Sequence, residues 1–300
     1  REKLQQNLVL RSKICKITRD YLDECGFLEI ETPMLGRSSP EGARDYLVPS
    51  RVHPGSFYAL PQSPQQYKQL LMIGGMDRYY QIARCFRDED LRANRQPEFT
   101  QIDLEMSFVD QEEEVMQITE GLLVRMFKEV RGVTLPDHFV RMPWTECMNR
   151  YGSDKPDLRF GMEIKCLDDI AGDSDFVVFK NAIADGGTVR AIVLEGGADK
   201  LSRKELDKLV EFVKTYKAKG LAWYGLGAEG VKCSFAKAVT AQELDKIAAS
   251  LGMKQGDIAL FVADKWQTAV VSLGALRCNL AARFGLYKSD DYAALWVVDF

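Results

Sequence analysis

The chain has 300 residues, enough for one or two domains with a buried core. Hydrophobic residues make up 46% of it, charged residues 28%, and the net charge is −4, which is typical of a globular protein and excludes a disordered, collagen-like or strongly basic chain. No apolar run is long enough to span a bilayer, so we expect no membrane association.

The cysteines and histidines indicate a reducing compartment. The seven cysteines are scattered, odd in number and form no C-x-x-C pair, which favours free thiols in the cytoplasm. Because His53 and His138 are the only histidines, a zinc site is not expected.

The first predicted helix runs from about Gln5 to Cys25. Its apolar residues recur at three- and four-residue spacing, and Gly26 is a natural end: Leu10, Ile14, Ile17 and Tyr21. One face of this helix is therefore expected to be buried.

Two alternating runs, Tyr79–Arg87 and Glu98–Phe108, flank a charged turn and predict an antiparallel hairpin. We expect one face of the second strand to lie in the core: Thr100, Ile102, Leu104, Met106 and Phe108. The other face carries an amide and two carboxylates, which cost stability unless something binds there: Phe99, Gln101, Asp103 and Glu105. A hairpin needs only about two to five loop residues, so this longer charged loop is expected to contact a ligand.

The second half of the chain alternates helices and strands. An amphipathic helix is predicted from about Glu112 to Val130. Two further helices are predicted to begin at capping boxes, at Ser202 and Thr240, and a third helix is predicted at 268–284. Strands are predicted at 220–226, at 257–263 and within 295–300. Residues 162–286 are expected to form a separate α/β domain.

Five segments, in order along the chain, resemble motifs of the class II aminoacyl-tRNA synthetases, in the bacterial aspartyl branch of that family. They are Gly26–Pro33 (motif 1), Pro40–Ser50 (the loop over the amino acid), Leu60–Gln69 (the aspartate-selecting segment), Phe86–Glu105 (motif 2) and Arg150–Asp157 (the bacterial form). The resemblance covers the chain from end to end. It implies an α+β fold in which an antiparallel sheet flanked by helices forms a catalytic domain, residues 1–161 and 287–300, with the α/β domain 162–286 inserted.

The resemblance also implies the activity. An enzyme of this kind joins L-aspartate to ATP as aspartyl-adenylate, releases pyrophosphate and passes the aspartyl group to tRNA. It uses Mg²⁺, works in the cytoplasm and forms a homodimer, for which the helix Gln5–Cys25 is the candidate interface.

Arg87 resembles the motif 2 arginine that bridges the aspartate carboxylate and the α-phosphate, a role suited to a planar guanidinium. By the same resemblance, Glu89 and Gln96 would contact ATP and Phe99 would stack on adenine. Arg92 and Arg95 would lie near the tRNA acceptor end.

Selection of aspartate needs a cation for the side-chain carboxylate, and Lys68 resembles the lysine that provides it. Asp103 would orient Lys68 as a countercharge. Ser63, Gln65 and Glu41 would receive the ammonium and main-chain groups of the amino acid.

From the residues alone, each assignment has an ordinary alternative: a surface ion pair of Arg87 with Asp88 or Asp103, a core position for Phe99, and solvated charges at Lys68, Glu41, Arg92 and Arg95.

The family has further parts that this chain lacks: an anticodon-reading β-barrel, additional acidic metal ligands, a histidine, a second substrate-binding arginine and the motif 3 arginine. We therefore expect the chain to be a fragment, inactive alone, with no complete metal site.

Rival readings are an asparagine or lysine synthetase, an asparagine synthetase on the same scaffold, and a catalytically inactive paralogue. Lys68 argues against amide and cationic substrates, because a buried lysine needs a carboxylate. Intact Arg87, Glu89 and Phe99 argue against loss of catalysis. The sequence leaves open whether the asparagine tRNA is also charged.

Overall fold

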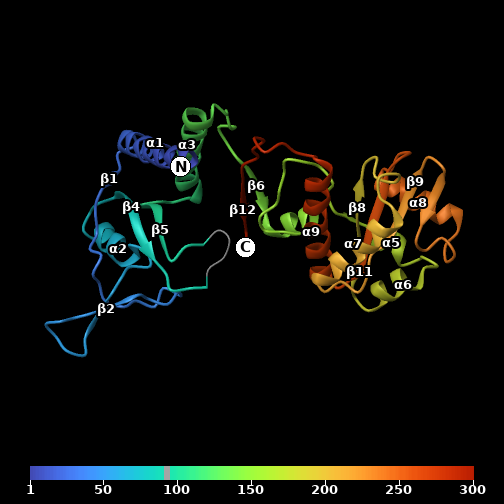
Figure 1. The fold of residues 1–300 in the computed structure, drawn as a ribbon, viewed down its shortest axis with the longest axis horizontal. Helices are drawn as coiled ribbons and strands as arrows, with labels where there is room; N and C mark the ends of the chain where they lie inside the picture. The colour runs from blue at the N-terminus through green and yellow to red at the C-terminus, as the bar shows by residue number, and fades with distance from the viewer. Residues whose placement is uncertain (91–94) are drawn as a thin grey trace. The chain divides into compact units, whose positions relative to one another are not determined.

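The computed structural model describes residues 1–90 and 95–300. These residues form two compact units, 1–138 and 139–300, which are described separately below (Figure 1). No helix in the described ranges is both long and apolar enough to cross a membrane.

Unit 1 is built on a three-stranded sheet. Strands β4 (Arg78–Phe86) and β5 (Glu98–Met106) pair antiparallel over nine residues each, with Gln81 opposite Asp103, and β1 (Leu28–Glu29) pairs parallel with β4. The predicted hairpin is confirmed, with strand ends within two residues of those expected.

Three helices and a small ribbon surround this sheet. They are α1 (Glu2–Glu24), α2 (Gln65–Ile73), α3 (Glu112–Arg131) and the ribbon of β2 (Leu47–Pro49) with β3 (Phe57–Ala59). Helix α1 packs against α3, and their contact includes an ion pair of 2.7 Å between Arg125 and Glu24 (Figure 1). The core of unit 1 joins α1 to the sheet through Leu22, Phe27 and Tyr80.

One face of β5 is less buried than the sequence predicted. Leu104 and Met106 pack against the core, but Ile102 is 38% exposed and Phe108 is 89% exposed. The prediction of a core position for these two residues is wrong, because the core formed with α1 reaches only Leu104 and Met106 and the chain has left the sheet before Phe108. The opposite, polar face is the better covered one.

Unit 2 is built on a five-stranded sheet of order β10-β9-β11-β8-β7, antiparallel throughout. Its strands are β7 (Lys165–Cys166), β8 (Thr188–Leu194), β9 (Ala222–Gly227), β10 (Gly230–Cys233) and β11 (Ile258–Asp264). Its helices are α5 (Asp168–Ala171), α6 (Val177–Ala184), α7 (Arg203–Thr215), α8 (Ala241–Leu251) and α9 (Trp266–Phe284). The predicted alternation of helices and strands is observed, with the strands running antiparallel.

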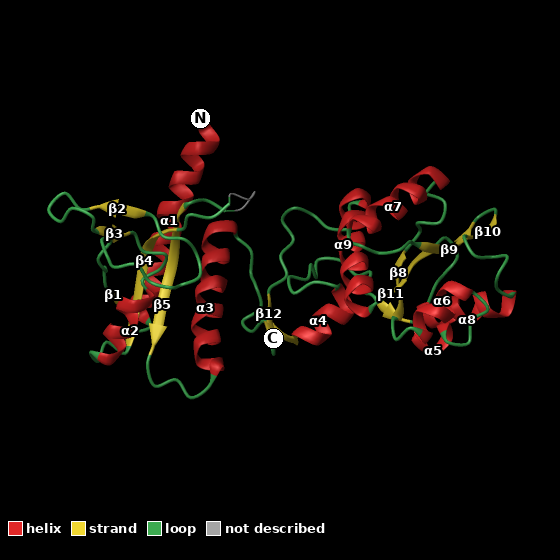
Figure 2. Ribbon diagram, turned by 90° about the horizontal axis from the view of Figure 1, so that it is seen from below, coloured by secondary structure: helices red, strands yellow, loops and turns green. Residues whose placement is uncertain are grey.

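Helices cover both faces of this sheet. Figure 2 shows α7 and α9 on one side of β8 and β11, and α5, α6 and α8 on the other. Alternate residues of β11 accordingly join two different cores, Leu260 the one with α9 and Phe261 the one with α8. A strand buried on both faces reads as a continuous apolar run, as β11 does.

The rest of unit 2 is attached to α9. Strand β6 (Val140–Pro143) leads into α4 (Trp144–Tyr151), which packs on α9, and β12 (Leu295–Val298) pairs parallel with β6. Arg277 of α9 is fully buried and donates to the carbonyl oxygens of residues 157 and 160–162, so it fastens that segment to the helix. Its guanidinium lies 4.2 Å from the centre of the Phe160 ring.

Replacing Gly152 by alanine should destabilise unit 2 by roughly 2–4 kcal/mol. Gly152 ends α4 at φ +68°, and a Cβ there would lie 1.9 Å from the carbonyl oxygen of Val270. All four tryptophans of the chain lie in unit 2, so tryptophan fluorescence during urea unfolding reports this unit.

The matched control is Gly161→Ala, because a Cβ at Gly161 meets nothing within 4 Å. Its unfolding free energy should stay within about 0.5 kcal/mol of the parent. Equal midpoints for the two variants would show that the contact between α4 and α9 is not as tight as described.

Candidate functional site

The polar face of the β4–β5 hairpin carries a buried cluster of charges. Lys68, in the first half of α2, extends its ammonium to the sheet, where Nζ lies 3.2 Å from Asp103 Oδ1 and 3.1 Å from Glu105 Oε2. The side chains of Lys68 and Asp103 are each 12% exposed, and that of Glu105 is 32% exposed. The ammonium of Lys68 therefore forms ion pairs with two carboxylates on this face of the sheet.

Burial and charge shift the titration of this cluster. Burial raises the pKa of Asp103, and this effect outweighs the opposing attraction of Lys68. Burial lowers the pKa of Lys68, but the charges of Asp103 and Glu105 reverse that effect and raise the pKa above its ordinary value. Asp103 and Lys68 thus each favour the charged form of the other.

The neighbours of Asp103 leave one of its oxygens unpaired. The hydroxyl of Tyr79 lies near Asp103, and its pKa is raised by burial and then by that charge, but it donates to Gln81 Oε1 at 2.9 Å. With that hydroxyl turned to Gln81, Asp103 Oδ2 is buried without a donor, and Tyr79 is the neighbour that can satisfy it by turning its hydroxyl.

Arg87 follows β4 at the other end of the same face. Its guanidinium lies 5.1 Å from the centre of the Phe99 ring, and its Nε is buried with no hydrogen-bond partner among the described residues. Stacking on Phe99 orients the Arg87 side chain. Among the described residues, Arg87 forms no ion pair with Asp88 or Asp103. The unpaired N–H can donate to an anionic oxygen.

Glu41 and Ser63 are brought together at the edge of the site. Ser63 Oγ donates to Glu41 Oε2 at 2.8 Å, and Ser39 donates to the other carboxylate oxygen at 3.0 Å. These residues line a small cavity of about 30 Å³. Gln65 begins α2, three residues before Lys68, and is half-buried.

A second, wider cavity of about 380 Å³ lies beside the turn of the hairpin. It is lined by Gly42, Ala43, Arg44, Asp88, Glu89, Asp90 and Arg95. Glu89 and Arg95 form an ion pair of 3.4 Å, and Gln96 is exposed. Arg92, also a predicted site residue, lies outside the described residues.

Sequence reasoning did not assign three residues that shape this site. Glu105 is the second partner of Lys68, and its position two residues after Asp103 was the available signal. Gln62 is buried and hydrogen-bonds to both backbone groups of Ala43, which fixes the loop over the site. Cys85 is fully buried, and burial, with the charge of Asp103, raises its pKa to about 11.

The described residues offer no metal site of their own: no group of three or more histidine, cysteine, aspartate or glutamate side chains is arranged to hold an ion.

Comparison with known proteins identifies the family. Residues 1–300 match the sequence pattern of the tRNA synthetases class II (D, K and N). The aspartate–tRNA ligase of Clostridium perfringens is 56% identical over 301 residues, which is 100% of this chain and 50% of that protein. The ligases of Ruminiclostridium cellulolyticum and Clostridium beijerinckii are 54% and 58% identical, over 100% and 97% of this chain and 50% and 48% of those proteins. The chain spans about half the length of these relatives.

Removing Lys68 should make stability depend on pH. In Lys68→Met, the buried Asp103 loses its cation, so its folded-state pKa rises further above the unfolded value. The folded form then binds a proton that the unfolded form releases, and stability falls as pH rises through this window. We expect the variant to be roughly 1–3 kcal/mol less stable, relative to the parent, at about pH 7.5 than at about pH 5.

Urea unfolding at both pH values measures this, followed by far-ultraviolet circular dichroism. The double variant Lys68→Met with Asp103→Asn should lose the added pH dependence. If the single and double variants respond to pH alike, Asp103 does not depend on Lys68.

Proposed function

The chain belongs to the class II tRNA synthetases (D, K and N), and from its likeness to the aspartate–tRNA ligases we propose that it acts as one of them. The reaction activates L-aspartate with ATP to aspartyl-adenylate and transfers the aspartyl group to tRNA. The observation that carries the choice of amino acid is the ammonium of Lys68, buried at the floor of the site and surrounded by carboxylates.

Lys68 selects aspartate by charge. Aspartate and asparagine are nearly the same shape, but a donor-only ammonium is satisfied by a carboxylate and not by an amide NH₂. Asp103 holds Lys68 in place from the middle of β5. Glu41, bonded by Ser63, receives the substrate ammonium at the edge of the site, and Gln65 receives main-chain groups of the amino acid.

Arg87 positions and stabilises the reacting groups. Attack of the aspartate carboxylate on the α-phosphate needs alignment and a positive charge where negative charge develops. The unpaired Nε of Arg87 and the fork of its guanidinium can hold oxygens of both reactants. Phe99, half-buried on the same face, stacks on adenine.

The cavity beside the hairpin turn receives the phosphates of ATP. Arg44 and Arg95 line it together with Asp88, Glu89 and Asp90, and Gln96 is next to Arg95 in the chain. Magnesium, when bound with ATP, would neutralise phosphate charge.

Arg92 and Arg95 contact the acceptor end of tRNA in this proposal.

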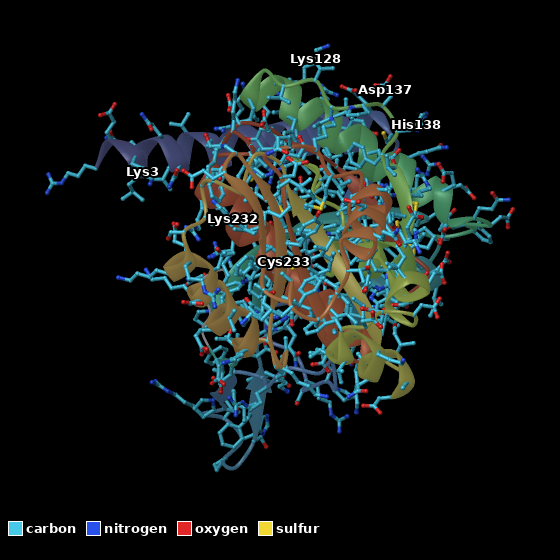
Figure 3. The ribbon with its side chains drawn as sticks, turned by 90° about the vertical axis from the view of Figure 1, so that its right-hand side faces the viewer. Lys3, Lys128, Asp137, His138, Lys232 and Cys233 are labelled. Atoms are coloured by element: carbon cyan, nitrogen blue, oxygen red, sulfur yellow. The ribbon has the colours of Figure 1, made fainter. Side chains whose placement is uncertain are left out.

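The first half of α1 is the proposed homodimer interface. It exposes Leu4, Leu8 and Val9, each at least 60% exposed, on a helix whose first twelve residues contain no buried side chain. Figure 3 shows Lys3 on this end of the helix, with its side chain in the open. A second copy of the chain would cover these apolar side chains.

Two further parts of the proposal concern organisation and location. Residues 162–286 form a domain inserted into the catalytic domain of residues 1–161 and 287–300, and they include the whole five-stranded sheet. All seven cysteines are free, which suits the cytoplasm. The rivals, an asparagine-related enzyme or an inactive paralogue, are disfavoured by Lys68 and by the intact pair of Arg87 and Phe99.

Arg87→Ala in the full-length enzyme should lower the rate of adenylate formation by ~100- to 1,000-fold, the scale for one preorganised charge-stabilising donor. Pre-steady-state adenylate formation measures it. Arg84→Ala is the control, because Arg84 lies on the same strand and pairs with Glu98 away from the site. A rate for Arg87→Ala within about threefold of the parent would remove Arg87 from the chemistry.

Lys68→Met should raise the aspartate KM steeply and shrink the preference for aspartate over asparagine, which such a site can set at ~10⁴ or more. The measurement is kcat/KM for both amino acids in pyrophosphate exchange. Lys128→Met, at an exposed lysine of α3 that Figure 3 labels, should leave both values unchanged. An unaltered preference in Lys68→Met would mean that selection rests on another residue.

A further inference from the structure

Lys68 has two counter-ions, and they are held differently. Asp103 lies in the middle of β5, is 12% exposed, and has one oxygen buried away from solvent. Glu105 lies one residue from the end of β5, is 32% exposed, and has a longer side chain. Both are within 3.2 Å of the ammonium.

The charges of this cluster do not leave room for a third carboxylate. One ammonium faces two carboxylates, so the formal charge of the three side chains is −1. A dicarboxylic amino acid that brings its side chain to Lys68 adds another negative charge at the same nitrogen. Like charges in so enclosed a space repel, and the repulsion among these side chains falls if one carboxylate leaves.

Glu105 is the carboxylate able to leave. Asp103 is only 12% exposed and its Oδ2 is buried, so its short side chain cannot reach water as readily. Glu105 is nearly a third exposed, and its long side chain can reach water by changing rotamer. Moving a partly exposed carboxylate into water costs little, because water replaces the lost ion pair.

We propose that Glu105 is a displaceable counter-ion of Lys68: it holds the ammonium in the empty site and gives up its position to the side-chain carboxylate of the incoming aspartate. This inference rests on the proposed function. Glu105 is a positioning residue that acts through Lys68. It keeps the ammonium in place in the empty site, and it weakens aspartate binding because it must be displaced. Asp103 stays on Lys68 in both states.

The test is Glu105→Gln in the full-length enzyme, because glutamine keeps the shape and removes the competing charge. The aspartate KM in pyrophosphate exchange should fall about threefold to tenfold, the range for a partly exposed ion pair. The kcat and the KM for ATP should stay within about twofold, on the same scale. A purely structural role for Glu105 would instead raise KM, or lower kcat and thermal stability together.

Two further variants sharpen the result. Glu98→Gln makes the same chemical change on the same strand, at a carboxylate that pairs with Arg84, and should leave the aspartate KM unchanged. Glu105→Ala removes the charge with a different side chain and should lower the KM in the same direction. An aspartate KM that is unchanged or raised in both Glu105 variants overturns the inference. An absence of aspartate-dependent exchange in the parent enzyme would instead overturn the proposed function.

Discussion

The site depends on one constraint: an ammonium and a carboxylate that are both buried on a strand face must satisfy each other. Lys68 and Asp103 are each 12% exposed, and burial disfavours the charged form of both. The 3.2 Å contact between them favours the charged form of each and so opposes the effect of burial. This contact exists only if helix α2 begins beside the sheet. The path of the chain from Pro61 to Ile73 is therefore constrained by the pairing of Lys68 with Asp103.

The same constraint orders the rest of unit 1. Covering a polar face requires a loop whose own backbone is satisfied, and Gln62 provides this by bonding both backbone groups of Ala43. Phe86 adds a bond from its N–H to the carbonyl of Pro61 at 2.9 Å. These bonds hold the segment of Ala43 and the residues before α2 to the sheet, so the protein itself positions Lys68 and Asp103, as electrostatic selection requires.

Much of this arrangement is predictable from sequence, and the failures have physical causes. The period-two alternation in residues 79–108 fixes the hairpin and separates Asp103 and Glu105 from Leu104, because successive side chains must point to opposite faces. Alternation cannot say how far a neighbouring helix reaches, so Ile102 and Phe108 were assigned to a core that stops at Leu104 and Met106. Motif resemblance identified Lys68 but not Glu105, because the pairing depends on where α2 lies over β5. The antiparallel order of unit 2 also depends on pairing between distant strands, which local patterns do not contain.

The most direct measurement of the central claim is a crystal structure of the full-length protein with L-aspartate bound. The account predicts that the substrate's side-chain carboxylate lies within hydrogen-bond distance of Lys68 Nζ, about 2.7–2.9 Å, with Asp103 still in place. A substrate whose side chain lies away from Lys68, while Asp103 and Glu105 keep the ammonium between them, would contradict it.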